Sequence, residues 1–422
     1  MARVLIAWEL GEAFGHLARC LQLTRCLIER GHQVMLVLKD VRLPAGASLP
    51  PGVTILPAPL TPDLRPSPPS PPSMPVNYAA MLRFSGFAHA ADVAARLTAW
   101  QGIFSLACPA VVVADHAPTA LLAAHLAGIP HVSIGNGFAI PPDCSPWPSI
   151  RPWETISHEA LVAAETALNE VTQAAQETLG YQTPATIRSV FAGPHVLDTF
   201  AELDHYGERP DGNYAGPIIS IPKLRRTTWQ TGGDGKILAY LRPEIPRFIS
   251  ILQALAKLDA QVICIAPGLS GADARRFATR RLRISLAPLD LEPLLEQADL
   301  AIGYGNSGFS TQALLAGVPL LMRPRHVEQA LMARQVEALG AGKLLAGRIE
   351  MNAVQEIVEE MLDQATGRQA AQAFRARHRG FSLEQALERT VAVIEQAVHG
   401  APETGRPWTA LDQQEIPKTW IH

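Results

Sequence analysis

A histidine and an aspartate stand after two apolar runs of the chain. His16 follows the run 4–8 through a glycine-containing turn, and Asp115 ends the run 110–114. Histidine can accept a proton near neutral pH, and a carboxylate bonded to its Nδ1–H would fix the tautomer and stabilise imidazolium. The pair could therefore act as a general base toward an attacking hydroxyl. The alternatives are a capping or buried role for His16 and a helix cap near Thr119 for Asp115.

A second group of candidate residues surrounds a turn rich in glycine and hydroxyl side chains. The turn covers 303–310, between the short apolar run 300–302 and a helix expected over 311–316. Gly317 would end that helix with a positive φ, and 318–322 fits a buried parallel strand. Because the turn opens a helix, unpaired N–H groups and the positive end of the helix dipole would meet there. Such a point suits a diphosphate.

The elements that must position these residues form two α/β units. The first unit opens with a strand over 4–8, a helix over 17–30 and a strand over 34–38. The second opens with a strand at 236–241, after a stretch at 210–235 that is rich in glycine and proline. Such alternation predicts two Rossmann-like domains. Further helices are expected at the ranges 78–106, 119–127, 157–179, 246–258, 351–370 and 383–398.

Composition narrows the class of protein. The chain has 422 residues, enough for two domains, and its formal net charge of −3 argues against a general nucleic-acid binder. No apolar run approaches the roughly 20 residues of a membrane span, and the N-terminus lacks the pattern of a signal peptide. The five scattered cysteines, with no C-x-x-C, indicate reduced thiols and a cytoplasmic protein.

The stretch from Tyr304 to Gln329 resembles the donor-binding motif of the GT-B-fold UDP-glycosyltransferase-like family. That motif reads H-G-G-x-G-T-T-x-E-A-L-x-x-G-V-P and then P-x-x-x-D-Q. The same frame here holds Tyr304, Gly305, Asn306, Ser307, Gly308, Phe309, Ser310, Thr311, Gln312, Ala313, Leu314, Gly317, Val318, Pro319, Pro324, Glu328 and Gln329. The opening Gly15-His16 is similar to the family's G-H-x-x-P, with Arg19 in place of proline.

The resemblance implies two Rossmann-like domains facing across a cleft. Residues 1–222 would bind the acceptor, residues 223–395 would bind the nucleotide-sugar, and the tail 396–422 would pack back on the first domain. It further implies an inverting, metal-independent glycosyltransferase in which His16 is the base and Asp115 its partner. No D-x-D motif for a metal is present, and no cofactor is expected besides a UDP- or dTDP-linked sugar as substrate.

The resemblance also assigns the donor-binding residues. They are Arg242, Leu286, Tyr304, Asn306, Ser307, Gly308, Phe309, Ser310, Gln312, Glu328 and Gln329. Tyr304 replaces the family's phosphate-contacting His, Gln312 its ribose-binding Glu, and Glu328 its sugar-binding Asp. Each replacement keeps a hydrogen-bonding group. A further hypothesis is that Arg323 or Arg325 reads an acidic sugar or the diphosphate.

Two other functions stay open from the sequence: a non-catalytic nucleotide-sugar sensor, suggested by the three replacements, and a nucleotide-sugar epimerase on the same fold. The expected partners are a nucleotide-sugar and a small-molecule or lipid acceptor, with at most peripheral membrane contact and no nucleic acid. The proline- and serine-rich range 57–75 is either a surface loop or an acceptor-side loop.

Overall fold

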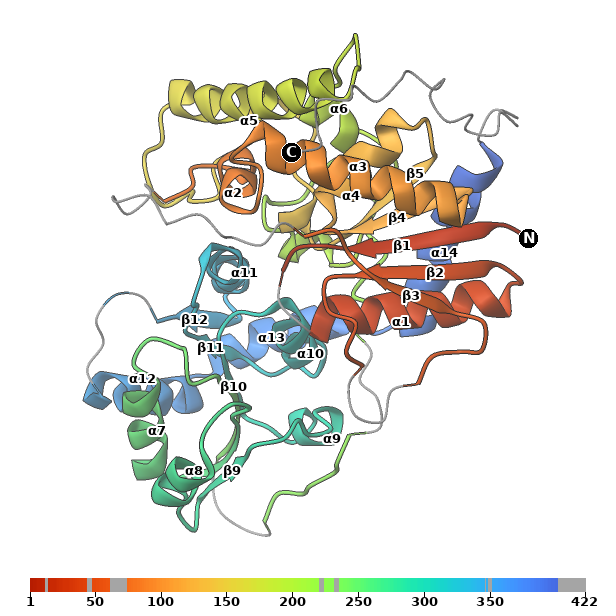
Figure 1. The fold of residues 1–422 in the computed structure, drawn as a ribbon. Helices are drawn as coiled ribbons and strands as arrows, with labels where there is room; N and C mark the ends of the chain where they lie inside the picture. Colours follow the sequence, from red (N-terminus) through yellow and green to blue (C-terminus); the bar gives the residue numbers. More distant parts are fainter. Residues whose placement is uncertain are drawn as a thin grey trace.

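The computed structural model describes residues 1–11, 14–43, 48–60, 74–219, 224–230, 235–345, 347 and 351–400. These residues form two α/β domains, each built on a parallel sheet with helices against it (Figure 1). The two Rossmann-like domains agree with the prediction. The predicted domain boundary between residues 222 and 223 and most of the loop at 57–75 lie outside the described residues.

The first sheet has the strand order β3-β2-β1-β4-β5-β6, and neighbouring strands run parallel. Its central strands are apolar and buried on both faces, as a sheet covered by helices on two sides requires. The strands are β1 (Arg3–Trp8), β2 (Gln33–Leu38), β3 (Thr54–Pro57), β4 (Val111–Asp115), β5 (His131–Gly135) and β6 (His195–Leu197). The helices are α1 (Phe14–Glu29), α2 (Tyr78–Phe84), α3 (Ala90–Ala107), α4 (Pro118–Leu126), α5 (His158–Thr178) and α6 (Ile187–Phe191), with 3-10 turns η1 (Gly137–Ala139) and η2 (Ala201–Leu203).

The second sheet repeats the plan in the order β12-β11-β10-β7-β8-β9. Its strands are β7 (Lys236–Tyr240), β8 (Gln261–Ile265), β9 (Leu282–Ser285), β10 (Leu300–Gly303), β11 (Leu320–Met322) and β12 (Gly342–Leu344). Its helices are α7 (Phe248–Lys257), α8 (Gly271–Phe277), α9 (Glu292–Leu295), α10 (Ser307–Leu315), α11 (Val327–Ala338), α12 (Met351–Asp363) and α13 (Ala365–Arg377). Two apolar clusters cover the two faces of this sheet.

Each sheet reverses its strand order at one place. In the first sheet this place lies between β1 and β4, and in the second between β7 and β10. In open parallel sheets, ligands bind beyond the carboxyl ends of the strands at such a point. The topology therefore predicts a site at the loops that follow these four strands.

The last helix, α14 (Leu383–His399), leaves the second domain and packs against α1 and the first sheet (Figure 1). Its apolar face, including Val391 and Ile394, belongs to the same buried cluster as Val4 and Ile6 of β1. Glu395 adds ion pairs to Arg30 and His32. The return to the first domain thus begins at residue 383, earlier than the tail predicted at 396–422, of which residues 401–422 lie outside the described part.

Several local expectations need correction. The predicted helix at 78–106 is two helices, because the chain turns between Phe84 and Ala90 and Gly86 adopts a φ of +99° there. The short elements β3, β9 and α6 were not predicted.

All five cysteines are free thiols, as predicted. Within the described residues, no helix is long and apolar enough to cross a membrane.

Candidate active site

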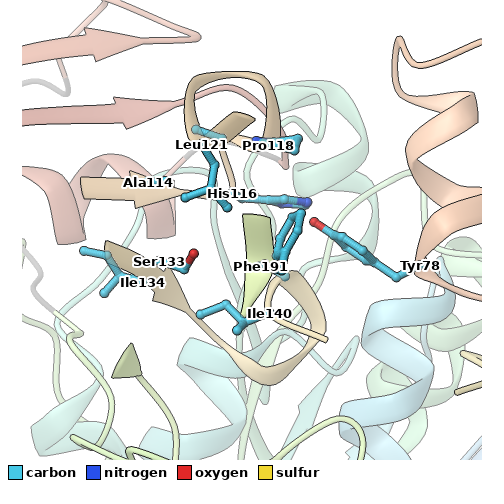
Figure 2. Close-up of a pocket in the computed structure, with 11 residues that line it drawn as sticks. Tyr78, Ala114, His116, Pro118, Leu121, Ser133, Ile134, Ile140 and Phe191 are labelled. Carbon is cyan, nitrogen blue, oxygen red and sulfur yellow. The ribbon is translucent and has the colours of Figure 1, made fainter. Parts of the chain in front are cut away.

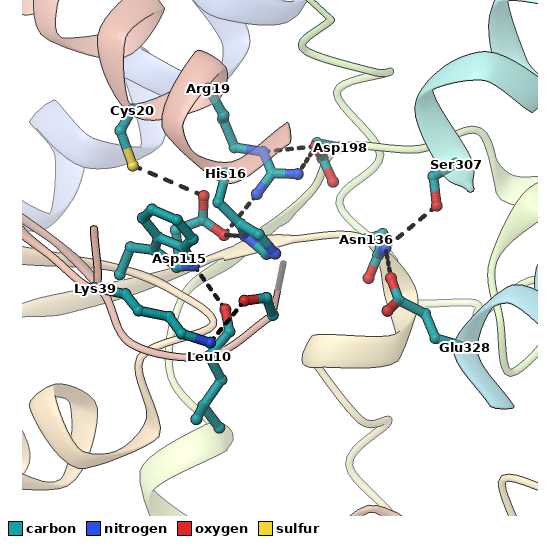
Figure 3. A network of polar contacts seen from close by, with 12 residues as sticks. Leu10, His16, Arg19, Cys20, Lys39, Asp115, Asn136, Asp198, Ser307 and Glu328 are labelled. Atoms are coloured by element: carbon teal, nitrogen blue, oxygen red, sulfur yellow. Dashed lines mark hydrogen bonds and ion pairs between the residues drawn. The ribbon is translucent and has the colours of Figure 1, made fainter. Parts of the chain in front are cut away.

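His16 and Asp115 meet at the reversal point of the first sheet. Asp115 is the last residue of β4 and lies opposite Trp8, the last residue of the neighbouring β1, while His16 stands in the first turn of α1. Nδ1 of His16 and Oδ1 of Asp115 are 2.8 Å apart (Figure 3). The ring of Trp8 stacks on the imidazole at a centroid distance of 5.4 Å. The His16 side chain keeps 19% of its exposure, whereas Asp115 is fully buried.

The helix cap considered for Asp115 is supplied by another carboxylate. Glu9, buried after β1, accepts hydrogen bonds from the backbone N–H groups of Thr119 at 2.8 Å and Ala120 at 3.2 Å, in the first turn of α4. Trp100 Nε1 donates to the same carboxylate at 2.6 Å. Asp115 is therefore not needed as the cap of α4 and is directed toward α1 instead.

Arg19 and Asp198 extend the pair into a buried network (Figure 3). Arg19 donates from Nη1 to Oδ1 of Asp115 at 2.6 Å and from Nε to Oδ2 of Asp198 at 2.7 Å. Asp198 follows β6 directly, so the network joins residues from α1, β4 and the end of β6. The Cys20 thiol donates weakly to the other oxygen of Asp115 at 3.9 Å.

The two acids of this network differ in pKa. Burial would raise the pKa of Asp115, but the charges of Arg19 and His16 and their hydrogen bonds together hold it below its ordinary value. Burial raises the pKa of Asp198 to about 6, although its contact with Arg19 acts in the opposite direction. Asp115 is therefore the carboxylate that stays ionised beside the imidazole.

The other imidazole nitrogen of His16 faces the loop after β1. A Cβ atom at Gly11 would lie 2.3 Å from His16 Nε2, and Gly11 has a φ of +87°, so this position requires glycine. Lys39 Nζ donates to the carbonyl of Gly11 at 3.0 Å and fixes the loop end. Nδ1 is bonded to Asp115, which leaves Nε2 as the nitrogen able to exchange a proton with a ligand.

A second imidazole, His116, lies deeper in the first domain. Its ring centroid is 6.0 Å from that of His16 and 6.1 Å from that of Tyr78. Burial, followed by the charge of His16, lowers the pKa of His116 to about 4, so this ring is neutral at neutral pH. Figure 2 shows His116 and the Tyr78 hydroxyl pointing toward one another at a mostly apolar cavity that Ile134, Ile140 and other residues line.

The N-terminus of α10 lies at the reversal point of the second sheet. The helix begins at Ser307, one turn earlier than predicted, so its free N–H groups are those of Ser307, Gly308 and Phe309. The Ser310 N–H already donates to Asn306 O at 3.1 Å, and the Ser310 side chain is fully buried. The unpaired N–H groups expected at this turn are therefore those of Ser307, Gly308 and Phe309, whereas the Ser310 N–H is used within the helix and its hydroxyl is buried.

The remaining residues predicted for the nucleotide end take different positions. Tyr304 follows β10, is largely buried and shares a hydrogen bond with Arg242, which follows β7. Phe309 packs inward beneath this pair, with its ring centroid 5.7 Å from that of Tyr240. Leu286, predicted at the nucleobase, is exposed on the loop after β9. Tyr304 and Arg242 are thus brought together, whereas Phe309 has a packing role.

Glu328 and Ser307 receive a side chain from the opposite domain. Asn136, which follows β5, donates from Nδ2 to Glu328 Oε1 at 2.8 Å and to Ser307 Oγ at 3.3 Å (Figure 3). Burial would raise the pKa of Glu328, but His205, His326 and the Asn136 bond hold it below its ordinary value. The contact joins the two domains at Glu328, the residue predicted to bind the sugar.

Gln312 and Gln329 are engaged within their own domain. Gln312 Nε2 donates to the carbonyl of Gly308 at 3.2 Å, one turn back on α10. Gln329 is buried, and its Oε1 accepts from the backbone N–H of Arg325 at 2.9 Å. Arg323 donates to the carbonyls of Leu345 at 2.6 Å and Gly347 at 2.8 Å, which makes its guanidinium a support of the loop after β12.

Sequence reasoning missed Asn136, Asp198 and His116 as members of the site. Asn136 and Asp198 each follow a strand of the first sheet directly, the same signal that identified Asp115. Applying that rule to every strand end would have found both. Within the residues that the structure describes, no group of three or more His, Cys, Asp or Glu side chains could hold a metal ion.

Comparison with known proteins agrees with this arrangement. Residues 249–380 match the family model for the erythromycin biosynthesis protein CIII-like C-terminal domain. A PGL/p-HBAD biosynthesis glycosyltransferase of Mycobacterium tuberculosis is 27% identical over 304 residues, which cover 65% of this chain and 68% of the relative. These proteins favour the transferase over the sensor and epimerase alternatives.

Solved structures share the fold. The glycotransferase of kitacinnamycin has a TM-score of 0.67 at 17% identity, covering 94% of this chain and 99% of its own. The glycosyltransferase VinC, solved in complex with dTDP, has a TM-score of 0.67 at 14% identity, covering 93% and 100%. The chain therefore has the GT-B fold, and its sequence is similar to that of glycosyltransferases over most of its length.

Proposed function

We propose that the protein is an inverting, metal-independent glycosyltransferase in which His16 and Asp115 form the general base. The observation that carries the proposal is the 2.8 Å contact between His16 Nδ1 and the buried, ionised Asp115 at the reversal point of the first sheet. Asp115 holds the Nδ1–H tautomer, so Nε2 accepts the proton. The acceptor, a small molecule or lipid, enters from the first domain.

The reaction then runs as a single displacement. The acceptor oxygen attacks the anomeric carbon while His16 Nε2 takes the hydroxyl proton, and the bond from that carbon to the diphosphate oxygen breaks. The sugar is transferred with inversion, and the nucleoside diphosphate leaves with the bonding electrons. Asp115 stabilises the imidazolium that forms, because its carboxylate stays ionised in the buried network.

The second domain stabilises the leaving diphosphate. The free N–H groups at the start of α10 and the dipole of this helix favour negative charge there. Tyr304 and Arg242, which bond to each other after neighbouring strands, add a hydroxyl and a cation. Glu328 would bind hydroxyls of the sugar. This field replaces the metal ion that other glycosyltransferases use against the same charge.

The donor is proposed to be a UDP- or dTDP-linked sugar. The complex of VinC with dTDP supports the thymidine nucleotide, since that protein shares the fold over nearly the whole chain. Gln312 in place of a ribose-binding Glu weakens the case for a nucleotide whose ribose carries two free hydroxyls. We expect dTDP to bind more tightly than UDP in titration calorimetry.

The test is the release of nucleoside diphosphate by the purified protein from a panel of UDP- and dTDP-sugars, with and without acceptor alcohols. We expect His16→Ala to lower turnover by about 10²–10⁴-fold while leaving dTDP affinity within about twofold. His32→Ala is the matched control, because His32 lies after α1 and pairs with Glu395 of α14 instead. Equal turnover by His16→Ala and the parent protein would disprove the base.

A chelator should leave the parent's rate unchanged. A loss of activity with the chelator that only added Mg²⁺ restores would disprove metal independence.

A further inference from the structure

Arg19 lies one helical turn after His16, on the same face of α1. Its Nη1 donates to Oδ1 of Asp115 at 2.6 Å, and His16 Nδ1 lies 2.8 Å from that same oxygen. Arg19 is buried, and so are both acids that it contacts. The carboxylate oxygen that would stabilise the imidazolium is therefore shared with a permanent cation.

The charges that surround the pair come from several elements. Asp115 ends β4, Arg19 belongs to α1, Asp198 follows β6, and His116 follows β4 as a neutral ring. Lys39 after β2 donates to Gly11 O, and Glu328 of the second domain accepts from Asn136. The Cys20 thiol stays protonated, because burial raises its pKa well above the ordinary value. Among the described charges of the first domain, Arg19 is bonded to the pair through Asp115, and Asp198 is bonded to Arg19.

We propose that Arg19 is a positioning residue that holds Asp115 against His16 and reduces the basicity of the pair, and that Asp198 moderates this effect as the counter-charge of Arg19. The inference rests on the proposed role of His16 as the base. Residue 19 is proline in the motif that the chain resembles, so the contact between Arg19 and Asp115 is a feature of this chain and not of the motif.

The physical reason is the distance of each charge from the imidazole. A cation that contacts Asp115 Oδ1 opposes protonation of His16, because it offsets the carboxylate's attraction and repels the imidazolium itself. Asp198 lies on the far side of Arg19 and partly neutralises it. Removing Asp198 should therefore make the pair less basic, and removing Arg19 should make it more basic.

The decisive comparison is between Asp198→Asn and the double variant Arg19→Met/Asp198→Asn, which differ only at residue 19, where the guanidinium and its bond to Asp115 are lost. The readout is the acid limb of the pH profile of kcat/KM for sugar transfer. We expect the limb of the double variant to lie at higher pH by about one unit or more. The single variant Arg19→Met should shift in the same direction relative to the parent protein.

Two controls separate a charge effect from damage to the fold. Arg25→Met removes an exposed cation from the same helix and should leave the acid limb in place. Arg19→Lys keeps the charge but cannot reach both acids, so we expect a lower kcat with a limb closer to that of the parent. A loss of packing alone would lower kcat in these variants, but it would not shift the pH of their acid limbs in the predicted directions.

The inference would be overturned if the acid limb of the double variant lay at the same pH as that of Asp198→Asn, or at a lower pH. That result would leave the proposed base intact. Failure of the proposed function has a different signature, because His16→Ala would then keep the turnover and the acid limb of the parent protein. If circular dichroism shows that the double variant does not fold, the acid limb of Arg19→Met is compared with that of the parent protein. A shift of that limb to lower pH would count against the inference.

Discussion

The amide of Asn136 in the first domain donates to the carboxylate of Glu328 in the second at 2.8 Å and also reaches the hydroxyl of Ser307 at 3.3 Å. Both partners belong to the stretch that resembles a donor-binding motif. One side chain of the first domain therefore orients two groups of the second domain. This contact joins the two domains, and a hydrogen bond to a charged group is among the stronger ones.

Replacing Asn136 with alanine should lower kcat/KM for the nucleotide-sugar roughly tenfold, because Glu328 loses the bond that orients it. Binding of the nucleoside diphosphate alone should stay nearly unchanged, since Glu328 is proposed to bind the sugar and not the nucleotide. Steady-state kinetics and calorimetry with the diphosphate measure the two quantities. An equal loss for both ligands would show that Asn136 supports the domain arrangement as a whole.

Asn136→Asp provides a sharper version of the same experiment. It preserves the shape of the side chain but places a second carboxylate against Glu328, so the loss at neutral pH should exceed that of Asn136→Ala. Activity relative to the parent should recover partly as the pH falls and one acid takes a proton. Parent-like activity of this variant at neutral pH would contradict the contact.

Asp198 should make the stability of the protein depend on pH. Its folded pKa, raised to about 6 by burial, lies above the ordinary value for Asp, so its stabilising contribution is full below about pH 4 and is lost as the pH rises through 6. Asp198→Asn lacks this titration. The free energy of unfolding of the variant relative to the parent should therefore rise by on the order of 3 kcal/mol between these limits and then level off. Urea unfolding across the range measures it, and a constant difference would refute the raised pKa.

The pair formed by Tyr304 and Arg242 should matter for the nucleotide itself. Tyr304→Phe removes the hydroxyl that bonds to Arg242, so we expect roughly tenfold weaker binding of the nucleoside diphosphate by calorimetry. Tyr240→Phe is the matched control, because its ring lies 6.2 Å from that of Tyr304 in the same aromatic group. Equal effects of both changes would mean that the Tyr304 hydroxyl serves packing only.

The sequence contained enough to predict the two domains and the meeting of His16 with Asp115. Alternating apolar runs and helical segments indicate Rossmann-like units, and residues after neighbouring parallel strands converge on one edge. Glu9 also follows a strand end directly, but the rule does not tell which of the acids at this edge caps α4 and which one meets His16. The break near Gly86 was missed because apolar residues continue on both sides of the glycine.

The donor half was harder to predict at the level of single residues. A motif gives the order of residues but not which of them face the ligand. Phe309 and Ser310 point into the core because the helix starts at Ser307, one turn before the expected residue. Cross-domain contacts such as that of Asn136 depend on how two separately folded units dock, and no local pattern in either unit encodes that relation.

Arg323 should contribute to stability instead of donor choice. Its guanidinium donates to two backbone carbonyls after β12, so Arg323→Ala should lower the free energy of unfolding by about 1–2 kcal/mol. The ratio of rates with neutral and acidic donor sugars should not change. Competition between the two donors measures this ratio, and a selective loss of the acidic donor would restore the hypothesis that Arg323 reads the sugar.

Gln312 should influence which nucleotide the protein prefers. Its amide donates to the carbonyl of Gly308, a bond that a carboxylate cannot make. Gln312→Glu should therefore release the side chain toward the ligand and supply an acceptor for ribose hydroxyls. We expect the affinity for UDP to rise relative to that for dTDP, by roughly three- to tenfold in calorimetry. Gln335→Glu on α11 is the control for an added negative charge elsewhere in the domain. An unchanged ratio of the two affinities would place Gln312 outside the ribose site.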